Sequence, residues 1–422
     1  MGRTARDNRD LPHPRPVKKI ELSEDNTKRR MIAAALFLLI GAAALAYAFF
    51  NLITPQIGWQ AIEAGSSSSV TCADEFVFLY ELGSSGVSAQ AENRAITQLY
   101  TQAARKAYQL FSNDESFDGI TNVYDINRNP NQVLEVDAAL YQAFSDIHAY
   151  GDRTIFLGPV YARYDDLFYC EDDAQLVDFD PRISESVRQE YSELAAFAAD
   201  PAAIDLQLLG ENQVCLYVSE AYLAYAGQAG IVDFIDFSWM KNAFIADYLA
   251  QVMIENGYTH GSISSYDGFL RNLDGRNTSY SLNLFDRADG TVYQVASMEY
   301  VGVMSVVHLR DYPINGMDKL HYYELRSGEI RTPYLDIRDG LCKSAVSDLT
   351  AYSRTQSCVE LLLQIKPVYI ADEFQKQALE SLSEAGIYSI YCEDRVIFGN
   401  DPELILTGLY DFEGVRYSVA QS

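Results

Sequence analysis

The sequence is short of positive charge. It contains 32 Lys and Arg residues against 59 Asp and Glu residues, which gives a formal net charge of -27 at pH 7. Proteins that bind nucleic acids gain much of their affinity by placing Lys and Arg against phosphates, so this excess of acid argues against such a partner. We therefore expect no nucleic acid among the partners of the protein.

The sequence also lacks the short motifs of the common active sites. It contains no dinucleotide-binding G-x-G-x-x-G, no phosphate-binding G-x-x-x-x-G-K-[S/T], no zinc-binding H-E-x-x-H and no G-x-S-x-G nucleophile turn. Its five histidines never pair at the spacing of metal ligands. Because many sites are assembled from distant segments, these absences exclude only sites that one short segment encodes.

Cysteine occurs six times, but never in a redox or metal-binding spacing such as C-x-x-C. In an oxidising compartment some of these cysteines would form disulfides, and the alternative is buried thiols that act as small apolar side chains. The sequence does not choose between the two. The six residues are Cys72, Cys170, Cys215, Cys342, Cys358 and Cys392.

Apolar residues, by contrast, are plentiful. Hydrophobic residues make up 48% of the 422 residues, and 30 tyrosines contribute to an aromatic share of 12%. This composition excludes a disordered chain, and the length suffices for a full core without disulfide or metal cross-links. The same length allows one large domain or two to three smaller ones.

One apolar run, residues 31–53, contains neither a charge nor a proline. As a helix it would span about 34 Å, enough for the ~30 Å hydrocarbon core of a bilayer. Residues 1–30 carry a net charge of +4 and the rest of the chain carries -31. Because positive flanks stay in the cytoplasm, we expect a single-pass transmembrane helix in the cytoplasmic membrane, with residues 54–422 outside the cytoplasm. A cleaved signal peptide is the alternative.

Beyond the apolar run, residues 54–71 combine proline, glycine and four consecutive serines, which is typical of a tether. Residues 72–422 contain no second linker and no repeat, so we expect a single extracytoplasmic domain. Strands are predicted at 292–310 and 388–398. The mixture of helices and strands without regular alternation favours an α+β fold. Helical periodicity predicts helices at 92–112, 136–149, 184–199, 239–256 and 371–385.

Residues 161–182 concentrate seven acidic side chains. Clustered carboxylates could hold Ca²⁺ or Mg²⁺ through their oxygens. Their spacing does not match a calcium-binding loop, and such runs usually form a solvated face. Both interpretations remain open at this point.

One order of segments is more specific than these patterns. A strand and a long helix are followed by SFDGITNVYDIN, FLGPV, IDFSWMKNAFIAD and HYYELRSGEIRTP. This order and spacing, over about residues 72–405, resemble the ApbE-type FAD:protein FMN transferases, which act outside the cytoplasm. The resemblance implies a flavin-transferase-like α+β domain, FAD and Mg²⁺ as cofactors, and often an N-terminal anchor.

The resemblance also implies which residues form the site. The stretch from Asp236 to Asp247 is similar to the family's D-L-G-G-I-A-K-G-Y-A-x-D, and His321 and Gly328 match its H-I-x-D-P-x-T-G-x-P. It implies Asp236 and His321 as catalytic residues. The cofactor-binding residues that it implies are Tyr124, Asn127, Asp236, Ser265, Asp267 and Gly268.

Two parts of the family pattern are altered near the expected cofactor. The family's Lys-Gly pair is replaced by Asn242-Ala243, and Lys241 comes one position early. On a regular helix one position turns a side chain by about 100°, so we expect Lys241 to point away from the family's direction. The glycine-rich cofactor loop keeps only Gly268.

The metal motif is altered as well. In the resembled family a late A-D-A-x-x-T supplies carboxylate and hydroxyl oxygens to Mg²⁺, and here the counterpart is SCVELL, residues 357–362. Cys358 and Leu362 replace the Asp and Thr, and a thiol and an alkyl group are poor partners for a hard cation. Glu360 is the nearest candidate metal ligand.

These observations leave three interpretations of function. The protein is a degenerate relative that acts in binding or assembly, or an active Mg-dependent transferase that attaches FMN to a Thr or Ser of an extracytoplasmic redox protein. The third is an unrelated extracytoplasmic module. The substitutions favour the first, for which we expect weak FAD binding that Mg²⁺ does not improve. In each case the expected partners are the cytoplasmic membrane, through residues 31–53, and an extracytoplasmic protein.

Overall fold

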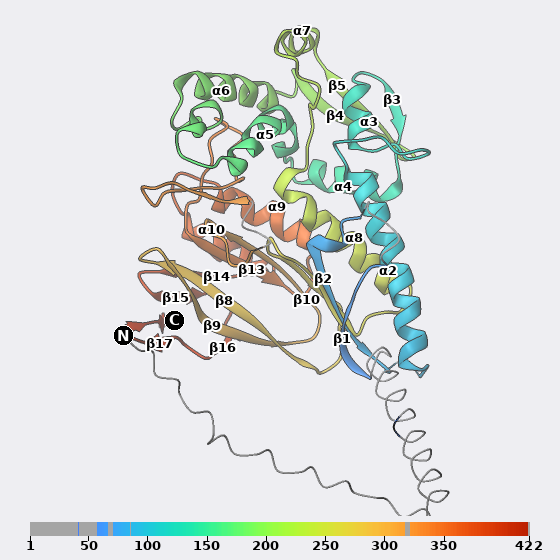
Figure 1. The fold of residues 1–422 in the computed structure, drawn as a ribbon, viewed down its shortest axis with the longest axis vertical. Coiled ribbons are helices and arrows are strands. Elements are labelled where there is room, and N and C mark those ends of the chain that lie inside the picture. Colours follow the sequence, from blue (N-terminus) through green and yellow to red (C-terminus); the bar gives the residue numbers. More distant parts are fainter. Residues whose placement is uncertain (1–40, 42–56, 66–70, 85, 317–320, 421–422) are drawn as a thin grey trace, which may run out of the picture. The chain divides into compact units, whose positions relative to one another are not determined.

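A nine-stranded sheet runs through the described part of the computed structural model, which comprises residues 41, 57–65, 71–84, 86–316 and 321–420 (Figure 1). Neighbouring strands are antiparallel except for the last pair, β15 and β19, which is parallel. In spatial order the strands are β1 (Gly58–Ile62), β2 (Phe76–Leu82), β6 (Gly261–Ser265), β7 (Phe269–Asn272), β10 (Met304–Arg310), β13 (Asp348–Ser353), β14 (Tyr388–Glu393), β15 (Val396–Gly399) and β19 (Ser418–Val419).

Three helices cover one face of this sheet (Figure 1). They are α2 (Ala89–Phe111), α8 (Lys241–Glu255) and α9 (Cys358–Tyr369). Helix α8 contacts both neighbours and lies against β6 and β7, while α9 lies against β10 and β13. The larger hydrophobic core is enclosed between these helices and the sheet.

Helix α2 follows the pattern that predicted it. The Ser88 side chain accepts a hydrogen bond from the amide of Ala91 and caps the first turn. Ile96, Tyr100 and Ala107 recur at helical spacing and are buried against the sheet. The predicted helices at 92–112, 136–149, 184–199 and 239–256 are confirmed to within three residues at each end.

A second sheet covers the opposite face. It consists of β8 (Ser279–Ala288), β9 (Thr291–Val301) and β16 (Ile405–Thr407), with β9 in the middle. Met298 of this sheet and Val306 of the main sheet belong to a second, smaller core. The central strands are therefore buried on both faces.

The segment between α2 and α8 forms a separate layer beside the helices (Figure 1). Its three-stranded sheet has the order β3-β5-β4, all antiparallel. The elements of the segment are α3 (Val123–Arg128), β3 (Val133–Glu135), α4 (Ala138–Ala149), α5 (Gly158–Tyr164), α6 (Glu185–Ala199), β4 (Ile204–Gly210), β5 (Gln213–Val218) and α7 (Glu220–Ala229). The remaining helix and strands are α10 (Lys376–Glu384), β11 (Tyr323–Glu324), β12 (Ile330–Arg331), β17 (Asp411–Phe412) and β18 (Val415–Arg416).

Three predicted elements differ from the structure. The strand expected at 292–310 is two strands in two different sheets, because the chain turns at Gly302, where φ is +85°. The strand expected at 388–398 is the hairpin β14–β15, which turns at Asp394 and Arg395, both with positive φ. The helix expected at 371–385 begins five residues late, at Lys376.

The N-terminal boundary of the domain also needs correction. Residues 54–71 were expected to be a tether, but residues 58–62 within them form β1, which pairs with β2 at the edge of the main sheet. The domain therefore includes residues that precede 72, and the compact unit runs from Ile57 to Ser422.

The expected transmembrane segment 31–53 and the expected cytoplasmic tail 1–30 lie outside the described residues, apart from Gly41. Among the helices that the structure does describe, none combines the length and apolar character needed to cross a membrane.

All six cysteines lie in the described residues, and each is a free thiol. The buried members are Cys72, Cys342, Cys358 and Cys392, whereas Cys170 and Cys215 are half-buried.

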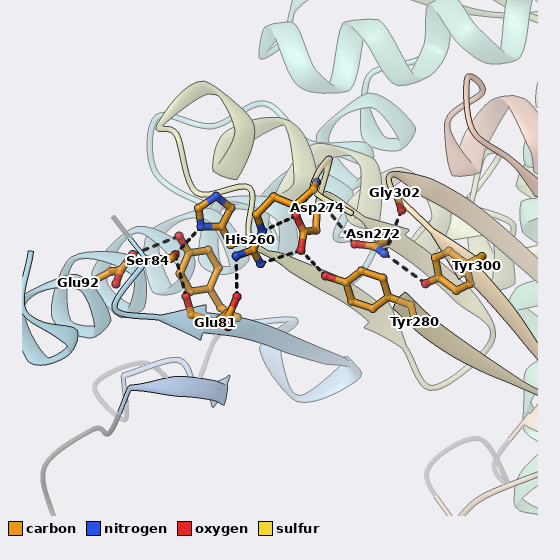
Figure 2. Close-up of polar contacts among 11 residues, drawn as sticks. Glu81, Ser84, Glu92, His260, Asn272, Asp274, Tyr280, Tyr300 and Gly302 are labelled. Carbon is orange, nitrogen blue, oxygen red and sulfur yellow. Dashed lines mark hydrogen bonds and ion pairs between the residues drawn. The ribbon is translucent and has the colours of Figure 1, made fainter. Parts of the chain in front are cut away.

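A polar network fixes one end of the main sheet (Figure 2). Arg276 forms ion pairs of 2.7 Å with both Glu81 of β2 and the fully buried Asp274. The hydroxyl of Tyr280 in β8 donates to the same Asp274 carboxylate at 2.5 Å. Burial alone would raise the pKa of Asp274, but the hydrogen bonds from Arg276 and Tyr280 outweigh it and hold the pKa well below its usual range.

Candidate functional site

A cavity of about 340 Å³ lies where α2 ends and α8 begins. Its volume is at the lower end of the range for small-molecule sites. Two predicted catalytic residues, Asp236 and His321, line it together, although 85 positions separate them in the sequence. Their roles in catalysis stay predictions, and the structure gives their location.

Asp236 is held rigidly at the wall of the cavity. One carboxylate oxygen accepts from the Ser238 amide at 2.7 Å, and the other accepts from the Asn113 side chain at 3.2 Å. Its own amide donates to the carbonyl of Ile155 at 2.8 Å. Burial raises the pKa of Asp236, and these hydrogen bonds and the Lys241 charge oppose the rise.

Asn127, predicted to bind the cofactor, lies behind this wall and is 2% exposed. Its amide oxygen accepts from the amides of Phe234 and Ile235, both at 2.9 Å. Its amide nitrogen donates to the carbonyl of Ile235 at 2.8 Å and to Asn113 at 2.6 Å. Four hydrogen bonds are the capacity of a side-chain amide, so Asn127 positions Asp236 and retains nothing for a ligand.

Tyr124, also predicted to bind the cofactor, is absent from the lining of this cavity. It lies on α3 with the Arg128 guanidinium 4.4 Å from its ring centre. Its amide donates to the carbonyl of Ser112, which does line the cavity. Tyr124 therefore contacts the segment that forms the wall.

Ser265, Asp267 and Gly268 form the tight connection between β6 and β7. The Ser265 hydroxyl accepts from the Phe269 amide at 3.0 Å. Gly268 has a φ of +117°, and a Cβ there would lie 2.4 Å from the carbonyl oxygen of His308, so only glycine fits. The retained glycine thus has a structural reason that is independent of any cofactor.

Asp267 extends the site. It lines a smaller cavity together with Trp239, His321 and Pro333, and these three residues also line the larger cavity. The side chain of Asn242 donates to the Asp267 carboxylate at 3.0 Å. Burial raises the pKa of Asp267, opposed by hydrogen bonds and by the nearby His321.

Lys241 lines the larger cavity. A 3₁₀ turn, Ser238–Met240, precedes α8 and winds more tightly than an α-helix. The direction of Lys241 relative to the family's lysine stays a prediction. The Lys241 ammonium lies 4.0 Å from the Glu75 carboxylate. Burial would lower its pKa, but the charges of Glu75 and Asp236 raise it. Lys241 is the only lysine between Asp236 and Asp247, and this feature of the sequence could have indicated that it lines the cavity.

The acidic run 161–182 is not wholly a solvated face. Asp165 lines the large cavity, and its pKa is raised to about 7 by burial and then by the charges of Asp236 and Asp166. Asp180 is fully buried and pairs with Arg331 at 2.7 Å. The run therefore contributes to the core and to the cavity at separate points.

Glu360, the predicted metal ligand, lies outside the lining of the cavity and caps helix α9. Its carboxylate accepts from the Ser357 amide at 2.7 Å, and the Ser357 hydroxyl accepts from the Glu360 amide at 3.1 Å. Asp247 accepts from the next two amides of α9, at 3.1 and 2.8 Å, and pairs with Arg271.

The side chains at the two replaced metal positions belong to the core. Cys358 and Leu362 are both 0% exposed, and the Cys358 thiol donates to the carbonyl of Leu270 at 3.2 Å. A buried thiol and an alkyl group do not fit Mg²⁺, which requires several oxygen ligands. Across the described ranges, from residue 57 to 420 with their gaps, no group of three His, Cys, Asp or Glu side chains is placed to hold a metal ion.

Comparison with solved structures identifies the fold. The ApbE protein from Thermotoga maritima matches with a TM-score of 0.53 and 14% identity, covering 79% of this chain and 94% of that chain. The flavin transferase ApbE from Vibrio cholerae matches with a TM-score of 0.51 and 10% identity, covering 83% and 98% respectively. No protein family and no curated protein sequence matches the chain. The predicted α+β fold, similar to that of the ApbE flavin transferases, is confirmed.

Proposed function

We propose that this chain is a binding protein built on the flavin-transferase fold and that it has lost the transfer reaction. One observation carries the proposal. At the start of α9, where the resemblance expects oxygen ligands for Mg²⁺, Cys358 and Leu362 are buried in the core. The two nearby carboxylates, Asp247 and Glu360, already bind the helix amides.

The physical argument concerns charge. Cleavage of the FAD pyrophosphate develops negative charge on phosphate oxygens, and a metal ion is the main means of stabilising it. Without oxygen ligands at this point the metal would be held poorly, and the remaining wall of the cavity is itself acidic at Asp165 and Asp236. Both effects disfavour the reaction.

An active transferase that attaches FMN to a Thr or Ser of an extracytoplasmic protein is the second candidate. This transferase is favoured by one observation, which is that a single cavity is lined by Asp236, Lys241 and His321. This candidate requires Mg²⁺ to be bound at a point other than the start of α9.

Calorimetric titration of the detergent-solubilised full chain with FAD, with and without Mg²⁺, tests the proposal. We expect weak or absent binding and no effect of the metal. Micromolar binding that Mg²⁺ strengthens, together with FMN transfer to an acceptor peptide, would establish the transferase instead.

Glu360→Gln is the matched variant for the metal prediction. Glutamine keeps the hydrogen bond that caps α9 but removes the charge. If metal-dependent FAD binding exists and disappears in this variant while its unfolding temperature stays unchanged, Glu360 is a metal ligand as the sequence predicted.

We further propose that residues 31–53 anchor the protein in the cytoplasmic membrane, with the domain outside and an extracytoplasmic protein as its partner. The charge asymmetry of +4 before the apolar run and -31 after its start supports this orientation.

A further inference from the structure

At the β1 edge of the main sheet, the described part of the chain leaves one face uncovered. Trp59 of β1 is paired with Glu81 of β2, and directly paired residues share a face of the sheet. Leu79 lies two positions from Glu81 and is therefore on the same face. Helix α2 covers the other face, where Phe78 is buried against Tyr100. The side chains of Trp59 and Leu79 thus point away from the helices.

The end of the second sheet contacts this uncovered face. Tyr280, near the start of β8, meets the Trp59 ring edge to face, with 5.9 Å between the ring centres. Tyr280 is in turn paired with Tyr300, near the end of β9. The turn from β9 to β10, which includes Val303, follows directly. Three segments of the chain therefore meet beside Trp59.

Large apolar side chains stay exposed on all sides of this contact. Ile57 is 81% exposed, and Trp59 and Leu79 are each 42% exposed. Val301 and Val303 are exposed to a similar degree as Trp59. Single apolar residues are ordinary on a protein surface, whereas a connected group of them marks a surface that contacts a protein or a membrane. We call these five residues the β1 surface.

The acidic side chain on this face is neutralised. Glu81, directly opposite Trp59, forms an ion pair of 2.7 Å with Arg276. A paired charge costs less than an isolated one when it approaches an apolar layer. The β1 surface therefore suits an apolar partner, although the protein as a whole carries a net charge of -27.

The place of the β1 surface in the sequence indicates which partner this is. If residues 31–53 span the membrane as proposed, four residue steps lead from residue 53 to Ile57. Four extended residues reach at most about 14 Å. The headgroup layer on each side of the hydrocarbon core is itself about 5–8 Å thick. Strand β1 would then begin in this layer or directly above it, at the depth where Trp is enriched in membrane proteins.

We propose that the β1 surface lies on the outer face of the cytoplasmic membrane, with its apolar side chains among the lipid headgroups. This inference rests on the proposed membrane anchor and adds a second contact between the protein and the bilayer. The β1 surface is small, so it orients the domain and does not hold it on the membrane without the anchor. An oriented domain presents the same side to every extracytoplasmic partner.

The experiment uses the two tryptophans of the chain, Trp59 and Trp239, as fluorescent probes. The full chain is reconstituted in phosphatidylcholine bilayers with and without bromine on the upper part of the acyl chains, because bromine quenches tryptophan on contact. Residues 31–53 contain no tryptophan, and Trp239 is buried in the domain. We expect bromine to lower the emission of the unaltered protein, and Trp59→Phe to abolish this quenching.

The double variant Ile57→Ser with Leu79→Ser tests whether the apolar side chains cause the contact, since it leaves the chain length before Trp59 unchanged. Both side chains are exposed, so the variant should fold normally. Because membrane contact scales with the apolar area that it buries, quenching of Trp59 should fall by about twofold or more. Val133→Ser with Leu209→Ser is the matched control. It changes two exposed apolar residues of the small β3-β5-β4 sheet and should leave the quenching unaltered.

The failures of the two proposals are distinguishable. If the chain separates from the lipid when the bilayers are floated on a density gradient, the proposed anchor fails, and this inference fails with it. If the chain stays with the lipid but Trp59 is not quenched, the β1 surface faces water or another protein, and this inference alone is overturned. Equal quenching in the Ile57→Ser, Leu79→Ser variant would assign the closeness to chain length, and would overturn it as well.

Discussion

At the scale of single residues, Asn127 is a residue of a cofactor-binding motif that positions the protein chain instead of binding a ligand. Its four hydrogen bonds hold the segment Phe234–Ile235 and the Asn113 side chain, and through them Asp236. The sequence places it at a motif of cofactor-binding proteins, but only the structure shows that its capacity is used internally.

Asn127→Ala should therefore reduce the free energy of unfolding by about 2–4 kcal/mol, because it leaves the amides of Phe234 and Ile235 buried without acceptors. Denaturation in urea measures the loss. Asn129→Ala is the control: the Asn129 amide nitrogen makes a single side-chain bond, to the carbonyl of Asp125, and should cost less than about 1 kcal/mol. Equal costs would contradict the positioning role.

Asp274 gives a residue-level prediction about pH. Its folded-state pKa is depressed, so its carboxylate stabilises the fold above the unfolded pKa of about 3.9, and this contribution is lost as pH falls towards the folded pKa. Asp274→Asn should cost about 1–3 kcal/mol at pH 7, and the difference from the unaltered protein should shrink below pH 4. Urea unfolding across pH 3–7 measures it.

The exposed pair of Asp289 and Arg395 provides the comparison for this network. Asp289 is 78% exposed, and such surface pairs contribute little. Asp289→Asn should change the free energy of unfolding by less than about 0.5 kcal/mol at every pH. If Asp274→Asn behaved in the same way, the network in Figure 2 would have no role in stability.

At the scale of elements, the start of α9 decides between the two candidate functions. Restoring the family residue by Cys358→Asp would place a carboxylate against the carbonyl of Leu270 and beside Asp247. We expect a loss of about 3–5 kcal/mol in unfolding free energy, as for an uncompensated buried charge. No Mg²⁺-dependent rise in unfolding temperature should appear.

Cys358→Ala is the matched control for this element, since it removes the thiol without adding charge and should cost only about 1 kcal/mol. Should Cys358→Asp instead stay folded and gain stability with Mg²⁺, the start of α9 would be a dormant metal site, and the proposed function would lose its main support.

Elements also mark how far the sequence alone could lead. The apolar periodicity of α2 and α8 was sufficient to predict both helices, because one face of each is buried in a single core. The apolar pattern of residues 292–310 was not sufficient to separate β9 from β10. Both strands are apolar, and they differ in the sheet that they join. The 3₁₀ turn before α8 was not predicted, because three residues leave no periodicity to detect. The sequence also did not indicate that Asp165 lies beside Asp236, because the two line one cavity only through the tertiary fold.

At the scale of the whole molecule, the charge asymmetry predicts topology. A specific protease site inserted after Gln56, ahead of the compact unit, should allow protease added to intact cells to release the domain. The same protein without the inserted site controls for unspecific cleavage, and an epitope tag before residue 1 should stay protected. Complete protection of the domain in intact cells would contradict the proposed orientation.

The passage of Gly268 beside the His308 carbonyl has an evolutionary consequence. In a library of random variants sorted only for display of a folded domain, glycine should persist at position 268. His321, exposed at the cavity, should drift freely in the same library. Selection for folding alone can thus preserve a motif glycine. The presence of such a glycine in a relative is therefore no evidence of catalytic activity.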